Sequence, residues 1–110
     1  MTVSDIKEKL EAKLCCGAEG LTKNVKGCYI GDLLSLAMAK VSSENIWITI
    51  QTNINIIAVS SLTDAACIIL PEGLVPDEQT INKADTEGIP VLSSEKDAYS
   101  IAKELAALGI

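Results

Sequence analysis

Three short apolar runs, separated by gaps long enough for a helix, constrain the fold of this chain most strongly. The runs are residues 46–50, 65–70 and 89–92. Neighbouring strands can be parallel only if a crossover of about a dozen or more residues returns the chain to the same edge of the sheet. The gaps have that length. The pattern from residue 46 onward therefore predicts a β-α-β-α-β-α order, with a parallel sheet between helices.

The first half of the chain carries weaker signals. Thr2 and Ser4 are candidate caps of a first helix, which is expected to give way to a short strand near residues 12–16. A second strand is expected over 25–30, and Asp32 is expected to cap the helix that follows it. That helix is expected to bury one apolar face, formed by Leu33, Leu34, Ala37, Met38 and Val41.

The crossover after the strand at 46–50 is ambiguous in composition. Residues 53–62 are rich in Ile and Val, which favour a strand, but the length of the gap favours a helix capped by Asn53. A further helix is expected over 77–88. Ser94 and Asp97 have the spacing of a capping box for a last helix.

The size and composition of the chain indicate one domain. Its 110 residues match a single folding unit, and 48% of them are apolar. The core must be aliphatic, because the only aromatic residues are Trp47, Tyr29 and Tyr99. We therefore expect residues 1–110 to form a single α/β domain, a three-layer α/β/α sandwich with a mostly parallel sheet of about five strands.

The charge of the chain excludes several partners. The net charge is −6, and the chain has no Arg with which to grip phosphates, so nucleic acids and acidic membrane surfaces are not expected partners. No apolar stretch has the roughly 20 residues of a membrane-spanning helix. Residues 1–14 carry Asp5, Glu8 and Glu11, unlike a signal peptide. A cytoplasmic location is the expectation.

The residue types also make an enzyme the weakest class. Hydrolase triads need an imidazole, and the chain has no His. It also lacks a P-loop motif and the paired ligands of a typical zinc site. We therefore expect no catalytic residues, no metal site and no cofactor.

Polar residues follow the expected strands at 25–30 and 46–50. In open α/β sheets, ligands bind at the carboxyl ends of the strands, so this edge is the candidate ligand site. Alternatively, Thr52 and Asn53 only cap a helix, and Gln51 is a turn residue. The candidate ligand-binding residues are Gly31, Asp32, Thr49, Gln51, Thr52 and Asn53.

Two other groups of residues have a possible function. Lys23, Lys26 and Gly27 could cradle an anion, or form a solvated loop. Cys15, Cys16 and Cys28 could serve a thiol-redox or iron–sulfur electron-transfer protein if the fold brings them together, although their spacing is unlike that of cluster ligands. Cys67 lies in an apolar run and is expected to be buried.

Four segments, taken in order, resemble the DRTGG-domain family. They are GCYIGDLL at 27–34, IWITIQTN at 46–53, IILPEG at 68–73 and GIPVL at 88–92. No single segment is highly specific, but their order and spacing together are fairly so. The resemblance covers essentially the whole chain and implies the same three-layer α/β/α sandwich.

The resemblance also implies a function. The family is similar to the amino-terminal domain of HPr kinase/phosphorylase and, distantly, to the first domain of muramyl ligases. Larger relatives carry the domain beside CBS domains or before phosphotransacetylase, which implies regulation or ligand sensing. Small standalone versions, which this chain resembles, are found near iron-only hydrogenase and NADH-oxidising complexes of anaerobes. A regulatory or docking module of a redox enzyme system, with a nucleotide-like ligand, is therefore implied.

The chain departs from the family at its name-giving residues. The family's Asp-Arg pair aligns with Thr52 and Asn53, and its Thr-Gly-Gly with Pro71, Glu72 and Gly73, so only the last glycine is retained. A charged ligand bound by that pair in relatives would here meet neutral groups. A structural homodimer is a third possible function, because the short apolar helix expected at 53–62 and many surface aliphatic residues favour self-association.

Overall fold

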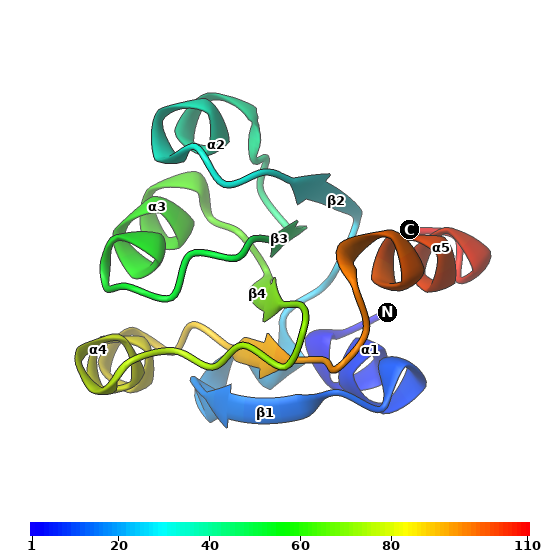
Figure 1. Ribbon diagram of the computed structural model, residues 1–110, viewed down its shortest axis with the longest axis horizontal. Helices are drawn as coiled ribbons and strands as arrows, with labels where there is room; N and C mark the ends of the chain where they lie inside the picture. The colour runs from blue at the N-terminus through cyan, green and yellow to red at the C-terminus, as the bar shows by residue number, and fades with distance from the viewer.

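Four parallel strands and one antiparallel strand form the sheet of the computed structural model, which describes residues 1–110 (Figure 1). The strand order is β1-β5-β4-β3-β2, and only the β1–β5 pair is antiparallel. The elements, in chain order, are α1 (Val3–Leu10), β1 (Lys13–Cys16), the 3-10 helix η1 (Ala18–Thr22), β2 (Gly27–Ile30), α2 (Leu34–Lys40), β3 (Asn45–Ile48), α3 (Asn55–Thr63), β4 (Cys67–Leu70), α4 (Glu78–Glu87), β5 (Val91–Ser93) and α5 (Ala98–Ala107).

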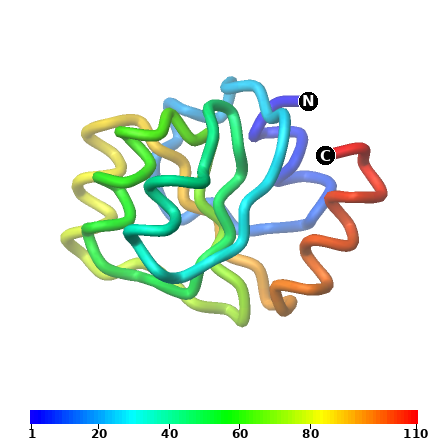
Figure 2. The backbone as a smooth tube through the Cα atoms, turned by 90° about the horizontal axis from the view of Figure 1, so that it is seen from above, coloured from blue at the N-terminus to red at the C-terminus, as the bar shows by residue number.

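Helices cover both faces of the sheet, as the spacing of the apolar runs predicts. Figure 1 shows α2, α3 and α4 on one face and α1 and α5 on the other, and Figure 2 shows the same layers from above. The predicted three-layer α/β/α sandwich with a mostly parallel sheet of five strands is therefore confirmed.

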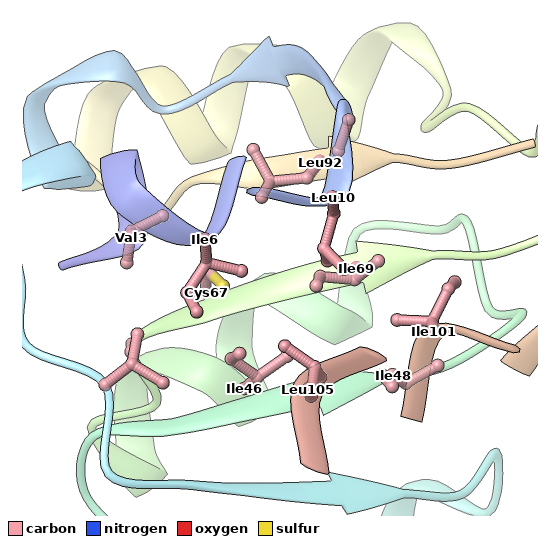
Figure 3. Close-up of a cluster of buried hydrophobic side chains, with 13 residues drawn as sticks. Val3, Ile6, Leu10, Ile46, Ile48, Cys67, Ile69, Leu92, Ile101 and Leu105 are labelled. Atoms are coloured by element: carbon pink, nitrogen blue, oxygen red, sulfur yellow. The ribbon is translucent and has the colours of Figure 1, made fainter. Parts of the chain in front are cut away.

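The alternation of side chains along the strands divides the core in two. On the face of α1 and α5, the sheet presents a row of Ile48, Ile69 and Leu92, which pair with one another across β3, β4 and β5. Figure 3 shows Ile48 and Ile69 near Ile101 of α5, and Leu92 near Leu10 of α1, all within one buried cluster. On the opposite face, Trp47 is fully buried under the other three helices. The core is aliphatic, and Trp47 is its one large aromatic residue.

The helix expected after the strand at 46–50 is confirmed as α3, but Ile54 precedes it and makes no side-chain cap. Asn53 lies one residue earlier, and its Oδ1 accepts a hydrogen bond from the amide of Asn55 (3.0 Å). The helix expected over 77–88 is also confirmed. Asp77 caps α4, and Gly88 ends it with a left-handed backbone (φ 66°), which glycine adopts without strain. None of the helices of the protein is long and apolar enough to span a lipid bilayer.

Two other predicted caps are wrong. Leu33 precedes α2 and makes no side-chain cap, because the Asp32 carboxylate turns toward the loop after β3 instead. Asp97 alone caps α5 and accepts a hydrogen bond from the amide of Ser100 (2.8 Å). Ser94 directly follows β5, and its Oγ accepts a hydrogen bond from the amide of Lys96.

The predicted apolar face of α2 is only partly correct. Ala37 and Val41 are buried, and Leu34 is half-buried. Leu33 and Met38 are 66% and 39% exposed, because α2 lies over the edge of the sheet and has neighbouring elements on one side only. An amphipathic pattern alone does not reveal where along the sheet a helix packs.

Three aspartates at helix starts make the stability of the fold depend on pH. Hydrogen bonds from the backbone of Thr2 and Ser100, and from the hydroxyl of Thr80, lower the pKa values of Asp5, Asp97 and Asp77 below their ordinary value of 3.8. Because these carboxyls bind protons more weakly in the folded state, their stabilising effect is complete above the unfolded pKa and is lost as the pH falls through the folded pKa.

We therefore expect the urea midpoint to fall as the pH is lowered from about 5 to about 2. Urea titrations of the native chain and of a triple Asp→Asn variant at these positions would measure the effect. Asn keeps the cap but does not titrate, so the variant should show a flatter pH dependence. Identical slopes for the two proteins would show that other carboxyls cause the loss.

Candidate functional site

The six predicted ligand-binding residues lie in two neighbouring loops. Strands β2 and β3 are parallel and adjacent, so the loops that follow them, residues 31–33 and 49–54, meet at the carboxyl edge of the sheet. Four of the six belong to one hydrogen-bonded network, namely Asp32, Thr49, Gln51 and Asn53. Gly31 and Thr52 lie beside it and bond to other residues through their backbone carbonyls. Residues that are at most 22 positions apart in the chain thus form one surface.

Asp32 is the centre of the network. Its Oδ1 accepts hydrogen bonds from the Thr49 hydroxyl (3.0 Å) and from the Ile50 amide (2.9 Å). Its backbone carbonyl accepts a third from the side-chain amide of Gln51 (3.0 Å). Asp32 is exposed and Thr49 is buried, so the network runs from the surface into the end of β3. This single side chain ties the loop after β2 to the loop after β3.

Two amide side chains extend the network to helix α3. The Asn53 Nδ2 donates to Gln51 Oε1 (3.1 Å), while Asn53 Oδ1 accepts from the amide of Asn55 at the start of α3. Asn53 therefore does not occupy the cap position itself, which is Ile54, but it links the candidate site to the helix. Thr52 contributes its carbonyl oxygen, which accepts from the Thr80 hydroxyl (3.1 Å) and from the Asp77 amide (3.2 Å).

Trp47 supports the site from the core side of the loop after β2. Its indole Nε1 donates to the carbonyl of Gly31 (2.9 Å), and the ring is fully buried. The hydrogen bond also holds the loop after β2 in place, because a buried indole N–H needs a partner.

Aromatic and aliphatic residues that were not predicted for the site surround the network. The Tyr29 ring lies against Gly31, where a Cβ would stand 2.9 Å from it. Ile30, Leu33 and Ile50 are 47%, 66% and 55% exposed beside the polar groups. The register could have indicated Tyr29, which pairs with Trp47 on the same face of the sheet. No local pattern indicates that these three aliphatic residues are exposed, because Ile30 ends an apolar strand and Leu33 and Ile50 lie in loops beside apolar segments.

The carboxyl edge of the sheet is acidic. The loops after the four parallel strands contain one lysine, Lys96, whose Nζ lies 2.8 Å and 2.9 Å from the carboxylate oxygens of Glu104. The carboxylates in these loops are Asp32, Glu72, Asp77, Glu95 and Asp97. A neutral or cationic ligand therefore suits this edge better than a polyphosphate.

The predicted anion loop lies at the other end of β2. The Lys26 Nζ is 3.6 Å from Glu44 Oε2, and its backbone amide donates to the Glu44 carbonyl. The carbonyl of Lys23 accepts from the amide of Val3, and Gly27 begins β2. These residues are therefore separate from the carboxyl-edge site, and a carboxylate of the chain already stands beside one lysine.

The structure does not bring the cysteines together. Cys15 and Cys16 lie on β1, and Cys28 lies on β2, at the opposite edge of the sheet. Three strands separate them, a distance of about 19 Å at the usual strand spacing. No group of three metal-ligating side chains occurs. The expectation that these thiols could converge on one redox or cluster site is therefore wrong.

Two of the thiols are also poorly suited to redox chemistry at neutral pH. Burial raises the pKa of Cys16 to about 12. Burial also raises the pKa of Cys67 to about 12, and Cys67 is completely inaccessible, as predicted. The thiolate is the reactive form, so the buried thiols of Cys16 and Cys67 react slowly at pH 7.

No cavity encloses the candidate site. The surface has two shallow hollows of about 440 and 470 Å³. One lies along α5, around Tyr99, and the other lies between the start of α3 and the outer side of α4. Neither includes any of the six predicted residues. The carboxyl-edge site is therefore an open surface.

The fold and the site define the class of protein: an α/β domain with a polar, open surface at the carboxyl edge of a parallel sheet. The chain belongs to the DRTGG domain family, whose sequence model matches residues 5–108. No curated protein sequence matches the chain.

A solved structure has a similar fold. It is the crystal structure of the CBS and DRTGG domains of the regulatory region of Clostridium perfringens pyrophosphatase, complexed with its activator, diadenosine tetraphosphate. The TM-score is 0.72 at 17% sequence identity, and the match covers 93% of this chain. The chain spans 44% of that structure's chain. At this identity the similarity establishes the fold alone.

Proposed function

We propose that this chain is a non-catalytic, cytoplasmic regulatory module that senses a small molecule at the carboxyl edge of its sheet. The observation that carries the proposal is the network from Asp32 through Gln51 to Asn53. It joins two loops to the first turn of α3. A ligand that binds Asp32 would compete with or strengthen these bonds and so shift the start of α3. Such coupling is what a sensor requires.

The hydrogen-bonding groups left over in the site suggest the chemistry of the ligand. Within the protein, the Asp32 carboxylate uses only Oδ1, and each amide nitrogen of Gln51 and Asn53 uses one of its two hydrogens. A carboxylate acceptor beside amide donors matches the adjacent hydroxyls of a ribose. The exposed Ile30 and Leu33 offer an apolar surface for a flat base.

The proposed ligand is therefore nucleoside-like. The pyrophosphatase region of similar fold is complexed with a dinucleotide activator, which supports this class of ligand. The acidic edge, in contrast, disfavours a long phosphate chain. The recognition contacts in this chain would accordingly be made with the base and the ribose.

Thermal unfolding against a metabolite panel tests the proposal. The panel contains adenosine, NADH, acetyl-CoA, a UDP-sugar and diadenosine tetraphosphate. A ligand at about 100 times its Kd should add about 2.7 kcal/mol to the free energy of unfolding and raise the Tm by several degrees. We expect Asp32→Ala to abolish the shift, measured from the variant's own unliganded Tm. Glu78→Ala, which removes an exposed acid outside the network, should preserve it.

The outcomes separate two functions. A shift that survives Asp32→Ala would place the ligand elsewhere on the domain. A flat panel would contradict ligand sensing and favour docking to another protein, for which the exposed Ile30, Leu33 and Ile50 provide an apolar surface.

We further propose a redox enzyme of the hydrogenase or NADH-oxidising class as the system that this module regulates. The support for this association is the resemblance of the chain to small proteins found near such enzymes. The separate likeness to the amino-terminal domain of HPr kinase/phosphorylase also stays a prediction. Titrating the purified chain into a hydrogenase reaction driven by NADH tests the association. A rate that does not change at any concentration would contradict it.

A further inference from the structure

Strand β2 is an open edge of the sheet. It pairs with β3 on one side only. The other edge strand, β1, begins with Lys13, and its register shifts between Leu14 and Cys16. A charged residue and an irregular register are the usual protections of an edge strand against pairing with another chain. Strand β2 has neither, and it contains no proline and no charged residue.

The backbone of β2 presents a regular set of hydrogen-bonding groups to this open edge. The amide of Gly31 donates inward to the carbonyl of Ile48 (3.1 Å). Alternate residues of a strand direct their amide and carbonyl groups to the same side, so the backbone groups of Tyr29 also point inward, toward β3. Cys28 and Ile30 therefore direct theirs to the open edge.

Several exposed apolar side chains follow one another along the chain from the end of β2 into α2. Ile30 lies on the same face of the sheet as its partner Ile48, and Leu33, Leu36 (45% exposed) and Met38 (39%) lie before and along α2, which covers the other face. Between Lys26 and Lys40 the only charged residue is Asp32. Two copies of a chain with a net charge of −6 repel each other, and the repulsion is weakest where the surface carries the fewest charges.

We propose that a second copy of this chain docks at the β2 edge, with the two β2 strands antiparallel and paired around Tyr29. In this register Cys28 of each copy lies opposite Ile30 of the other, so all the outward backbone groups of both residues are satisfied. The two Tyr29 residues form the close pair at the two-fold axis. The arrangement is isologous, and the two sheets become one continuous sheet.

Charge complementarity favours this register for a second copy over an unrelated partner. Lys26 and Asp32 flank Tyr29 at the same separation, three residues on either side. Antiparallel pairing around Tyr29 places Lys26 of each copy opposite Asp32 of the other. The interface does not require a ligand, so the inference goes beyond the proposed sensing function and can fail independently of it.

The mass of the protein in solution tests the docking surface. Sedimentation of the native chain should give twice the 11.6 kDa of one chain. Cys28→Lys adds a charge at an exposed edge position and should raise the dimer dissociation constant at least about tenfold. Leu62→Lys is the matched control, because Leu62 is exposed apolar surface on α3, away from β2, and should leave the dimer intact. Circular dichroism verifies that each variant is folded.

A disulfide test fixes the register. In Ile30→Cys, the new thiol should bond to Cys28 of the other copy on oxidation with copper phenanthroline. The Cα atoms of such a hydrogen-bonded pair lie about 5.5 Å apart, within the range of a disulfide. Ile30→Cys combined with Cys28→Ser should not crosslink, because the remaining thiols lie on a diagonal, about 7–8 Å apart.

A monomer at all concentrations would overturn the proposal. It would also be overturned if Cys28→Lys left the dimer unchanged, or if the double variant crosslinked as well as the single one. A dimer that loses its crosslink only in the double variant supports both the surface and the register.

Discussion

Replacing Trp47 with alanine is expected to lower the free energy of unfolding by about 3–5 kcal/mol. The side chain is fully buried at the centre of the core layer under α2, α3 and α4, and it is the one large aromatic residue there. Its removal leaves a cavity lined by aliphatic side chains and an unpaired carbonyl at Gly31. Domains of this size have a total stability of about 5–15 kcal/mol, so much of the margin is lost.

Urea denaturation followed by circular dichroism measures this loss, since the variant lacks the only tryptophan. Trp47→Phe is the control that keeps most of the ring volume but removes the hydrogen bond to Gly31. It should lose about 1–3 kcal/mol. If Trp47→Ala and Trp47→Phe were equally stable, the packing of the ring would contribute little, contrary to the structure.

Replacing Gly17 with alanine is expected to lower the free energy of unfolding by about 3 kcal/mol or more. Gly17 has a φ of 77°, in the left-handed region. A Cβ at this position would overlap the backbone carbonyl of Ile89. The clash is with backbone on the turn into β5, so it cannot be relieved by rotating a side chain. The amide of Gly17 also donates to Asp85 Oδ1 (2.7 Å), a bond that any shift would break.

Gly109→Ala separates the two causes of that loss. Gly109 also has a positive φ, 86°, but a Cβ there has no atom within 4 Å. Gly109→Ala should lower the free energy of unfolding by only about 1–2 kcal/mol, the cost of a left-handed backbone at a residue other than glycine. Thermal denaturation of both variants measures the difference. Equal losses would mean that the packing of Gly17 against Ile89 is looser than the structure shows.

The candidate site depends on the same core that these variants test. Trp47 holds the loop after β2 through Gly31, and Asp32 then positions the loop after β3. A ligand response should therefore weaken in Trp47→Phe even where the fold survives. The proposed dimer edge is strand β2, which directly precedes this loop, so a ligand and a second copy would act on adjacent segments of the chain.

Much of the fold follows from local patterns in the sequence. The spacing of the three apolar runs predicts the parallel sheet, because a crossover needs the length of a helix. Asp77 and Gly88 mark the ends of α4 correctly, since a cap and a left-handed glycine are determined by neighbouring residues. The six candidate site residues follow from the same logic, because the ends of adjacent parallel strands must meet at one edge.

Other features depend on contacts between segments that are distant in the sequence. Asp32 looks like a helix cap in its own segment, but its carboxylate finds better donors at Thr49 and Ile50, which only strand pairing brings near. Cys16 and Cys28 are twelve positions apart, yet they lie at opposite edges because β5, β4 and β3 pair between their strands.

By itself, the sequence determined which segments form helices and strands, and which polar residues end up at the carboxyl edge. Only the tertiary structure decided which partners those polar groups bind, which thiols stay apart and which aliphatic side chains of α2 remain exposed. The physical reason is the range of the interactions. Periodicity and capping act over one or two turns of chain, whereas hydrogen-bond partners and burial are set by whichever strands and helices pack alongside.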